Sequence, residues 1–151
     1  MTSVRDDEAQ ELTALVLAAG NALVDGIHNG VVARGFADLR PAHGFAFARL
    51  APSGATISEL AVHLGMTRQA AGQLVDELVA KGYVERRPHP DDGRARLIVL
   101  TDRGWACTRA ADQAAAETIK IWADTLGEDR LRALRNDLAQ VAPPGRLRPT
   151  W

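Results

Sequence analysis

Two short capped helices joined by a glycine turn constrain the fold of this chain more than any other feature. Residues 56–59 read TISE, a capping box in which the Thr56 hydroxyl accepts the backbone N–H of Glu59 and the Glu59 carboxylate accepts that of Thr56. We expect this helix to end at Gly65, because glycine enters a left-handed turn at little steric cost. Thr67 then caps a second helix, predicted to run to about Lys81 before Gly82 ends it.

Two short extended stretches follow, at residues 83–87 and 96–100, separated by the turn-rich sequence PHPDDG. This pattern predicts a β-hairpin with a flexible tip. Residues 97–100 are all apolar, so the sequence leaves open which side of the second strand faces the core. Two helices joined by a short glycine-containing turn are typical of a helix-turn-helix, and the added hairpin makes it a winged one.

Apolar stripes at helical spacing lie on both sides of this unit. The first covers about residues 7–29, with Gly30 as the expected stop, and comprises Leu12, Leu15, Val16, Ala19, Leu23 and Ile27. A short helix opens at Pro41 and a loop follows at residues 52–54. Thr101 and Asp102 cap a long helix that carries the stripe Ala111, Ala115, Ile119, Trp122 and Leu126. Gly127 separates it from a last helix with Leu131, Leu134, Leu138 and Val141, and the tail from residue 143 to Trp151 is expected to be loose.

We therefore predict a mainly α fold with a small β-hairpin, in three parts. Residues 1–30 form an N-terminal dimerisation helix, residues 31–104 a winged helix-turn-helix, and residues 105–151 C-terminal dimerisation helices and a tail. The stripes on the terminal helices need burial that a small domain alone does not supply.

The second helix of the unit divides into two faces. One is apolar and predicted to point inward, through Ala70, Ala71, Leu74, Leu78 and Val79. The other presents Gln69, Gly72, Gln73 and Asp76, with Arg68 beside them. Arginine can bind guanine and glutamine can bind adenine by paired hydrogen bonds in the major groove of DNA, although by itself such a face is more often an ordinary solvated surface.

The hairpin strengthens the DNA interpretation because it concentrates positive charge in a chain whose net charge is −1. Arg86, Arg87, Arg94 and Arg96, together with His89, form a basic patch suited to phosphate or minor-groove contacts. The alternative is a salt-bridged hairpin, since Asp91 and Asp92 lie at its tip. We expect the patch to contact DNA in part and to form salt bridges in part, with Asp92 orienting Arg94.

At this point the sequence resembles a known family. The segments GMTRQA (65–70), LVDELVAKGYVER (74–86), PDDGRAR (90–96) and LTDRG (100–104) are similar to those of the MarR family of bacterial winged helix-turn-helix regulators. The resemblance runs from roughly Leu39 to Gly104, and the flanking helices match the family in layout but carry little motif.

The resemblance implies a homodimer with interlocked terminal helices that binds a pseudo-palindromic double-stranded DNA operator, usually as a repressor, and responds to a small-molecule effector. It makes Arg94 the wing-tip residue, supported by Asp92, and leaves Arg86 with a structural role. It also implies an effector pocket between the dimer helices and the DNA-binding part, for which Phe36, Phe45, Phe47 and Trp105 are candidates, although core packing is an alternative role for each. The full set of predicted DNA-contacting residues is Thr67, Arg68, Gln69, Gly72, Gln73, Arg87, Arg94 and Arg96.

Other chemistries find little support. No catalytic motif, cofactor motif or metal-type histidine spacing is present, so we expect neither an enzyme nor a cofactor or metal site. The single Cys107 is expected to be a buried, inert thiol. With an acidic N-terminus and no apolar run judged long enough to span a membrane, the chain is expected to be cytoplasmic. Two alternatives stay open: a winged-helix module that binds protein instead of DNA, and the dimerising piece of an enzyme.

Overall fold

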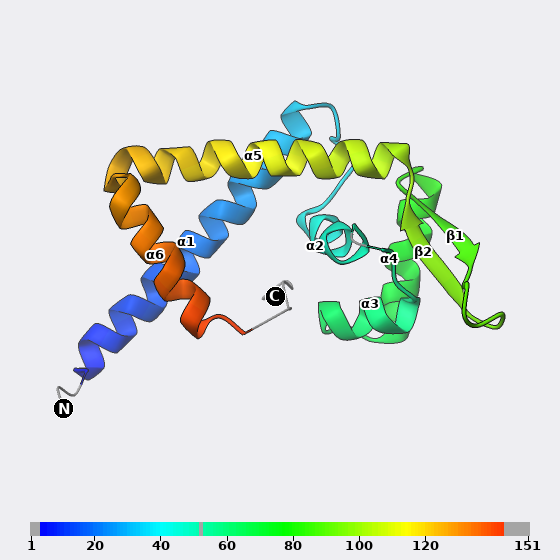
Figure 1. Cartoon of the computed structure of the whole chain (residues 1–151), viewed down its shortest axis with the longest axis horizontal. Helices are drawn as coiled ribbons and strands as arrows, with labels where there is room; N and C mark the ends of the chain where they lie inside the picture. The colour runs from blue at the N-terminus through cyan, green and yellow to red at the C-terminus, as the bar shows by residue number, and fades with distance from the viewer. Residues whose placement is uncertain (1–3, 52, 144–151) are drawn as a thin grey trace.

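The computed structural model describes residues 4–51 and 53–143. Along the chain lie α1 (Asp6–Ala33), α2 (Pro41–Leu50), α3 (Ile57–Leu64), α4 (Arg68–Ala80), β1 (Val84–Pro88), β2 (Arg96–Leu100), α5 (Asp102–Leu126) and α6 (Glu128–Val141). Helices α1, α5 and α6 extend away from a compact unit made of α2, α3, α4 and the hairpin (Figure 1). The predicted tail from residue 144 onward, and Pro52 of the predicted loop, lie outside the described residues.

The predicted helix boundaries around the glycine turn are confirmed. The Thr56 hydroxyl accepts from the Glu59 backbone N–H at 3.2 Å, and Glu59 returns the contact at 3.1 Å. Gly65 ends α3 in the left-handed conformation, with φ of 66°. Thr67 caps α4 through the Ala70 N–H at 3.1 Å. The sequence sets this geometry locally, because each cap satisfies backbone groups that the helix end leaves unpaired.

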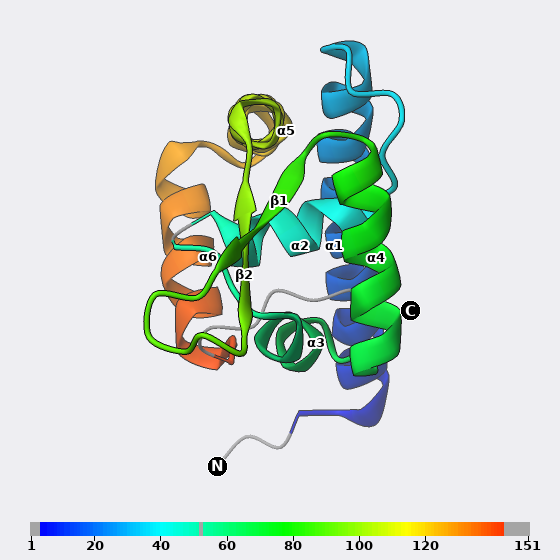
Figure 2. The same cartoon turned by 90° about the vertical axis from the view of Figure 1, so that its right-hand side faces the viewer.

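The two strands form an antiparallel hairpin whose register pairs Val84 with Leu100 and Pro88 with Arg96. A bridge between Ala55 and Ile98 attaches β2 to the residue before the cap of α3. Ile98 and Leu100 are buried, which settles the facing that the apolar sequence of this strand left open. The hairpin is therefore held at its base by the core and projects its tip outward (Figure 2).

Helix α4 buries Ala71, Leu74, Val75 and Leu78 against α3 and the base of the hairpin. The prediction that Val79 points inward is wrong: its side chain is 36% exposed, whereas Val75 is fully buried. Spacing of i, i+3, i+4 and i+7 from Ala71 places Val75 at the centre of the inner face and Val79 at its edge.

Helix α1 continues past Gly30 to Ala33, so the prediction that Gly30 stops this helix is wrong. A Cβ added to Gly30 would overlap the Cβ of Ala114 on α5, and one added to Gly26 would lie 2.8 Å from the Thr118 hydroxyl. These glycines therefore serve the close crossing of α1 and α5, and glycine inside a helix is tolerated when a neighbouring backbone must approach.

Helix α1 is also long and apolar enough, by length and composition alone, to cross a membrane. This contradicts the expectation that no apolar run reaches such a length. The property is weak evidence for a membrane span, because core helices pass the same test, and α1 packs along α5.

Much of the apolar surface of the terminal helices is uncovered in the single chain. Leu12 is 62% and Ile121 65% exposed, and further exposed apolar side chains on these helices are Leu15, Val16, Leu17, Leu138 and Val141. Exposed apolar surface on this scale is typical of an interaction surface.

Candidate nucleic-acid interface

The outer face of α4 lies in solvent. Arg68, Gln69, Gln73 and Asp76 are exposed. A Cβ built on Gly72 would meet no heavy atom within 4 Å, so the surface of α4 is open at this position between Gln69 and Gln73. The apolar face packs inward, and the polar groups capable of reading base edges are therefore free to meet a partner.

Two of the hairpin arginines form ion pairs within the described residues, and two do not. Arg86 forms an ion pair with Asp76 of α4, which ties the hairpin to that helix. The Nε of Arg87 donates to Glu85 on its own strand at 2.7 Å. Arg94 and Arg96 are exposed, and neither forms an ion pair within residues 4–51 and 53–143. The free positive charge therefore gathers at the tip and outer strand of the hairpin.

Asp92 acts on the backbone of the wing tip. Its carboxylate accepts from the backbone N–H of Arg94 at 3.0 Å, and its carbonyl accepts from that of Ala95 at 3.1 Å. Asp92 thus shapes the loop that presents Arg94, and the Arg94 guanidinium is left for another partner.

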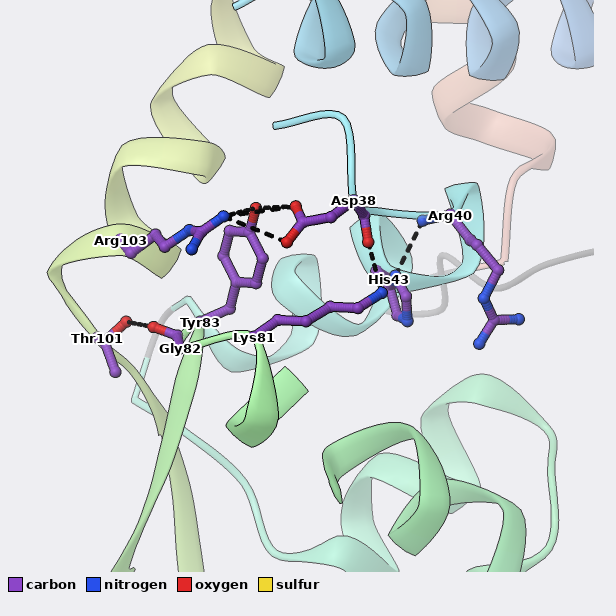
Figure 3. A network of polar contacts seen from close by, with 8 residues as sticks. All are labelled: Asp38, Arg40, His43, Lys81, Gly82, Tyr83, Thr101 and Arg103. Carbon is purple, nitrogen blue, oxygen red and sulfur yellow. Dashed lines mark hydrogen bonds and ion pairs between the residues drawn. The ribbon is translucent and has the colours of Figure 1, made fainter. Parts of the chain in front are cut away.

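Sequence reasoning missed the contacts that hold the C-terminal half of α4. Glu77 accepts from the Arg40 guanidinium at 2.8 Å and pairs with His43 Nε2 at 3.2 Å. Tyr83 donates its hydroxyl to Asp38 at 2.6 Å, and Lys81 donates to the Asp38 carbonyl at 2.5 Å (Figure 3). These partners are 34 to 45 residues apart in the chain, and no local pattern marks such pairs.

The same contacts shift several pKa values. Burial lowers the pKa of His43, against the opposing effect of Glu77, so the imidazole is neutral at pH 7. The hydrogen bond from Arg40 is the largest cause of the lowered pKa of Glu77, and the bond from Tyr83 that of Asp38. Burial raises the pKa of Tyr83 to about 12. The carboxylates are thus ionised and the phenol protonated, which suits the donor and acceptor roles seen here.

Arg103, at the start of α5, completes this junction. Its guanidinium donates to the Tyr83 hydroxyl at 3.0 Å and to Asp38 at 3.2 Å, and its carbon lies 4.4 Å from the centre of the Tyr83 ring. The end of the α1–α2 loop, the start of the wing and the start of α5 therefore meet at one side chain.

A cavity of about 500 Å³ lies between α1, α2 and α5. Its walls are mainly apolar, and they include Phe45 and Phe47 but neither Phe36 nor Trp105 of the four predicted aromatic residues. The polar residues among those lining it are Asn21, His28, Arg40, Thr108 and Asp112. Such a cavity suits a small ligand that is largely apolar.

Cys107 also lines this cavity, is 2% exposed, and burial raises its pKa to about 11. A thiol in this state is a poor nucleophile at neutral pH, in keeping with the predicted inert role. Within the described part of the chain, no group of three or more His, Cys, Asp or Glu side chains is placed to hold a metal ion.

Comparisons with known proteins agree with this geometry. A sequence model described as MarR family matches residues 37–95. An uncharacterized protein of Mycobacterium tuberculosis is 31% identical over 86 residues, which cover 57% of this chain and 60% of that protein. The multiple antibiotic resistance protein MarR of Escherichia coli is 34% identical over 85 residues, 56% of each chain. The match thus spans less than two thirds of either curated relative.

Solved structures match over more of the chain. The crystal structure of wild-type, apo MarR from Escherichia coli has a TM-score of 0.71 and 25% identity, covering 87% of this chain and 97% of that one. The transcriptional repressor CouR, solved bound to a 23-mer DNA duplex, has a TM-score of 0.71 and 26% identity, covering 94% of this chain and 100% of that one. The winged-helix fold and the flanking helices predicted from the sequence are therefore confirmed.

Proposed function

We propose that this chain, whose residues 37–95 match a sequence model described as MarR family, is a winged helix-turn-helix transcription regulator of that family. In this proposal it binds double-stranded DNA sequence-specifically, as a homodimer, and represses transcription in the cytoplasm until an effector binds. One observation carries the proposal. The face of α4 that presents Arg68, Gln69 and Gln73 is exposed beside a hairpin whose Arg94 and Arg96 are exposed. This arrangement supports the proposal, because a groove-binding helix and a phosphate-contacting wing require hydrogen-bonding side chains beside free positive charge.

Each predicted contact has a distinct role in this proposal. Arg68, Gln69 and Gln73 bind base edges, and Gly72 allows α4 to approach the groove closely. Thr67 caps the N-terminal turn of α4, which faces the DNA phosphates. Arg94 and Arg96 contact the phosphates or the minor groove. Arg87 contributes positive charge at the same strand, partly offset by Glu85.

Homodimerisation accounts for the exposed apolar side chains of α1, α5 and α6. A second copy would cover them and place two α4 helices on one face of a duplex. Half-sites about one helical turn apart would then fit a pseudo-palindromic operator. Sedimentation velocity is expected to give a dimer, and replacing Leu12 and Leu15 by Glu should shift it towards monomer.

The cavity between α1, α2 and α5 is the proposed effector site. It adjoins both the helices of the proposed dimer interface and α2, which contacts α3 of the DNA-binding part. A ligand that prefers one arrangement of these parts shifts the population towards it, and this is the physical requirement for regulated DNA release.

Anisotropy titrations of duplexes from the region upstream of the gene, against scrambled duplexes of the same composition, test the proposal. Gln73→Ala should reduce discrimination by about 1–3 kcal/mol while sparing nonspecific affinity. Arg94→Ala should weaken binding to every duplex and lower the slope of log K against log salt by about 1. Arg132→Ala removes one exposed charge from α6, at the opposite end of the molecule from the hairpin (Figure 1), and should change neither. Equal, weak affinity for all duplexes would contradict the proposal, and a dimer that ignores DNA would favour a protein-binding module.

A further inference from the structure

We propose that Glu77 is a positioning residue through which residues 38–43, here called the strap, transmit occupancy of the cavity to the recognition face of α4. The proposal rests on the proposed function, since it assigns the coupling between the effector site and the DNA-reading helix.

One side of the strap forms part of the cavity. Leu39, Arg40 and Pro41 are lining residues, and the wall continues into α2 through Gly44 and Phe45. A ligand that fills this space therefore contacts the strap, and these contacts favour the positions of the strap that fit the ligand.

The other side of the strap forms hydrogen bonds with α4 and with the residues that follow this helix. Arg40 and His43 both bond Glu77, and Asp38 accepts from Lys81 and Tyr83. Glu77 lies one helical turn after Gln73 on the same exposed side of α4. Because a helix moves as a rigid unit over a few turns, a displacement at Glu77 is carried to Gln73 and Gln69.

The hydrogen bond between His43 and Glu77 is costly to break. The side chain is fully buried, and its Nδ1 accepts from the Arg40 backbone N–H at 2.9 Å. The proton therefore resides on Nε2, which donates to Glu77 at 3.2 Å. Movement of the start of α2 must either take Glu77 with it or leave a buried donor unsatisfied, and the second outcome is costly.

The walls of the cavity point to an effector that is mainly apolar and the size of two or three aromatic rings. N-phenyl-1-naphthylamine, an uncharged dye whose fluorescence rises in apolar surroundings, is a suitable probe. Hydrogen exchange of the full chain, with and without this dye and with no DNA present, measures whether α4 responds.

In the wild-type protein we expect saturable dye fluorescence and at least a twofold change in the exchange rates of amides in residues 74–82. In Glu77→Gln the dye should bind within about twofold of the wild-type affinity, but the change in exchange should fall by more than half. Arg40→Gln removes the same ion pair from the other side. Because Arg40 also lines the cavity, this variant is compared with the wild type at saturating dye, where it should show the same loss, and it keeps the test valid if Glu77→Gln folds poorly. Glu59→Gln, which breaks the comparable Arg49–Glu59 pair between α2 and α3, should keep the full response.

The proposal is overturned if the dye shows no saturable binding, if it binds without altering exchange in α4, or if the response persists in both the Glu77→Gln and the Arg40→Gln proteins. A purely structural Glu77 would change exchange equally with and without dye. Since no DNA enters this experiment, failure to bind an operator would count against the proposed function and leave the coupling result intact.

Discussion

The missing side chain of Gly30 is what lets α1 lie against Ala114 of α5, because a Cβ at position 30 would overlap the Cβ of Ala114. The same crossing brings Gly26 against Thr118. Helices α1 and α5 both line the cavity and both carry exposed apolar surface, so this contact sets the frame for the proposed effector site and dimer interface.

Gly30→Ala is expected to destabilise the protein by about 1–3 kcal/mol, the usual cost of forcing extra volume into a packed contact. Helix propensity alone predicts the opposite sign, since alanine is favoured over glycine by about 1 kcal/mol. Urea unfolding followed by circular dichroism distinguishes the two. A Gly30→Ala protein as stable as wild type would show that α1 and α5 can separate at no cost.

Gly72→Ala is the matched substitution in open space, and it should separate stability from DNA binding. With no neighbour within 4 Å, the methyl group should stabilise α4 by roughly 0.5–1 kcal/mol. The same methyl group lies between Gln69 and Gln73 on the face proposed to enter the groove, so affinity for the operator should fall about tenfold, or 1.4 kcal/mol. A raised melting temperature with unchanged DNA affinity would remove Gly72 from the interface.

Tyr83→Phe removes the hydroxyl that donates to Asp38 and accepts from Arg103. We expect a loss of about 1–2 kcal/mol in the free energy of unfolding, typical of a part-buried hydrogen bond with charged partners. The aromatic ring, which packs against Phe47 at a centroid distance of 5.6 Å, is retained. Chemical denaturation provides the measurement, and Arg103→Lys, which keeps the charge but changes the geometry of donation, should cost less than the loss of the hydroxyl.

His43 is expected to make stability depend on pH. Its pKa in the folded protein lies below the ordinary value of 6.5, chiefly because of burial, while Glu77 acts in the opposite direction and Arg40 and Lys81 reinforce the shift. Its contribution to stability is therefore fully present above pH 6.5 and is lost as the pH falls through the lower, folded-state pKa.

Urea unfolding at pH 7.5, 6.5 and 5.5 checks this expectation. His43→Gln should flatten the decline between the first and last of these values, whereas His89→Gln in the hairpin loop should leave it as in the wild type. An equal decline in the His43 variant would place the pH dependence elsewhere.

Local patterns in the sequence were sufficient to predict the helices and strands of the winged helix-turn-helix unit. The caps at Thr56, Thr67 and Thr101 and the turns at Gly65 and Gly82 depend on residues within four positions of one another, and the structure confirms them. The outward face of Gln69 and Gln73 follows from the helical repeat in the same way.

Only the tertiary structure revealed the contacts between residues that lie far apart in the sequence. Nothing near Gly30 in the sequence distinguishes a helix stop from a packing contact, because the deciding atom belongs to Ala114, 84 positions later along the chain (114 minus 30). Likewise the strap contacts of Asp38, Arg40 and His43 with Glu77, Lys81 and Tyr83 join segments that only the folded core brings together. Hydrogen bonds and packing at long range act between side chains that folding places side by side, and they leave no periodic trace in the sequence.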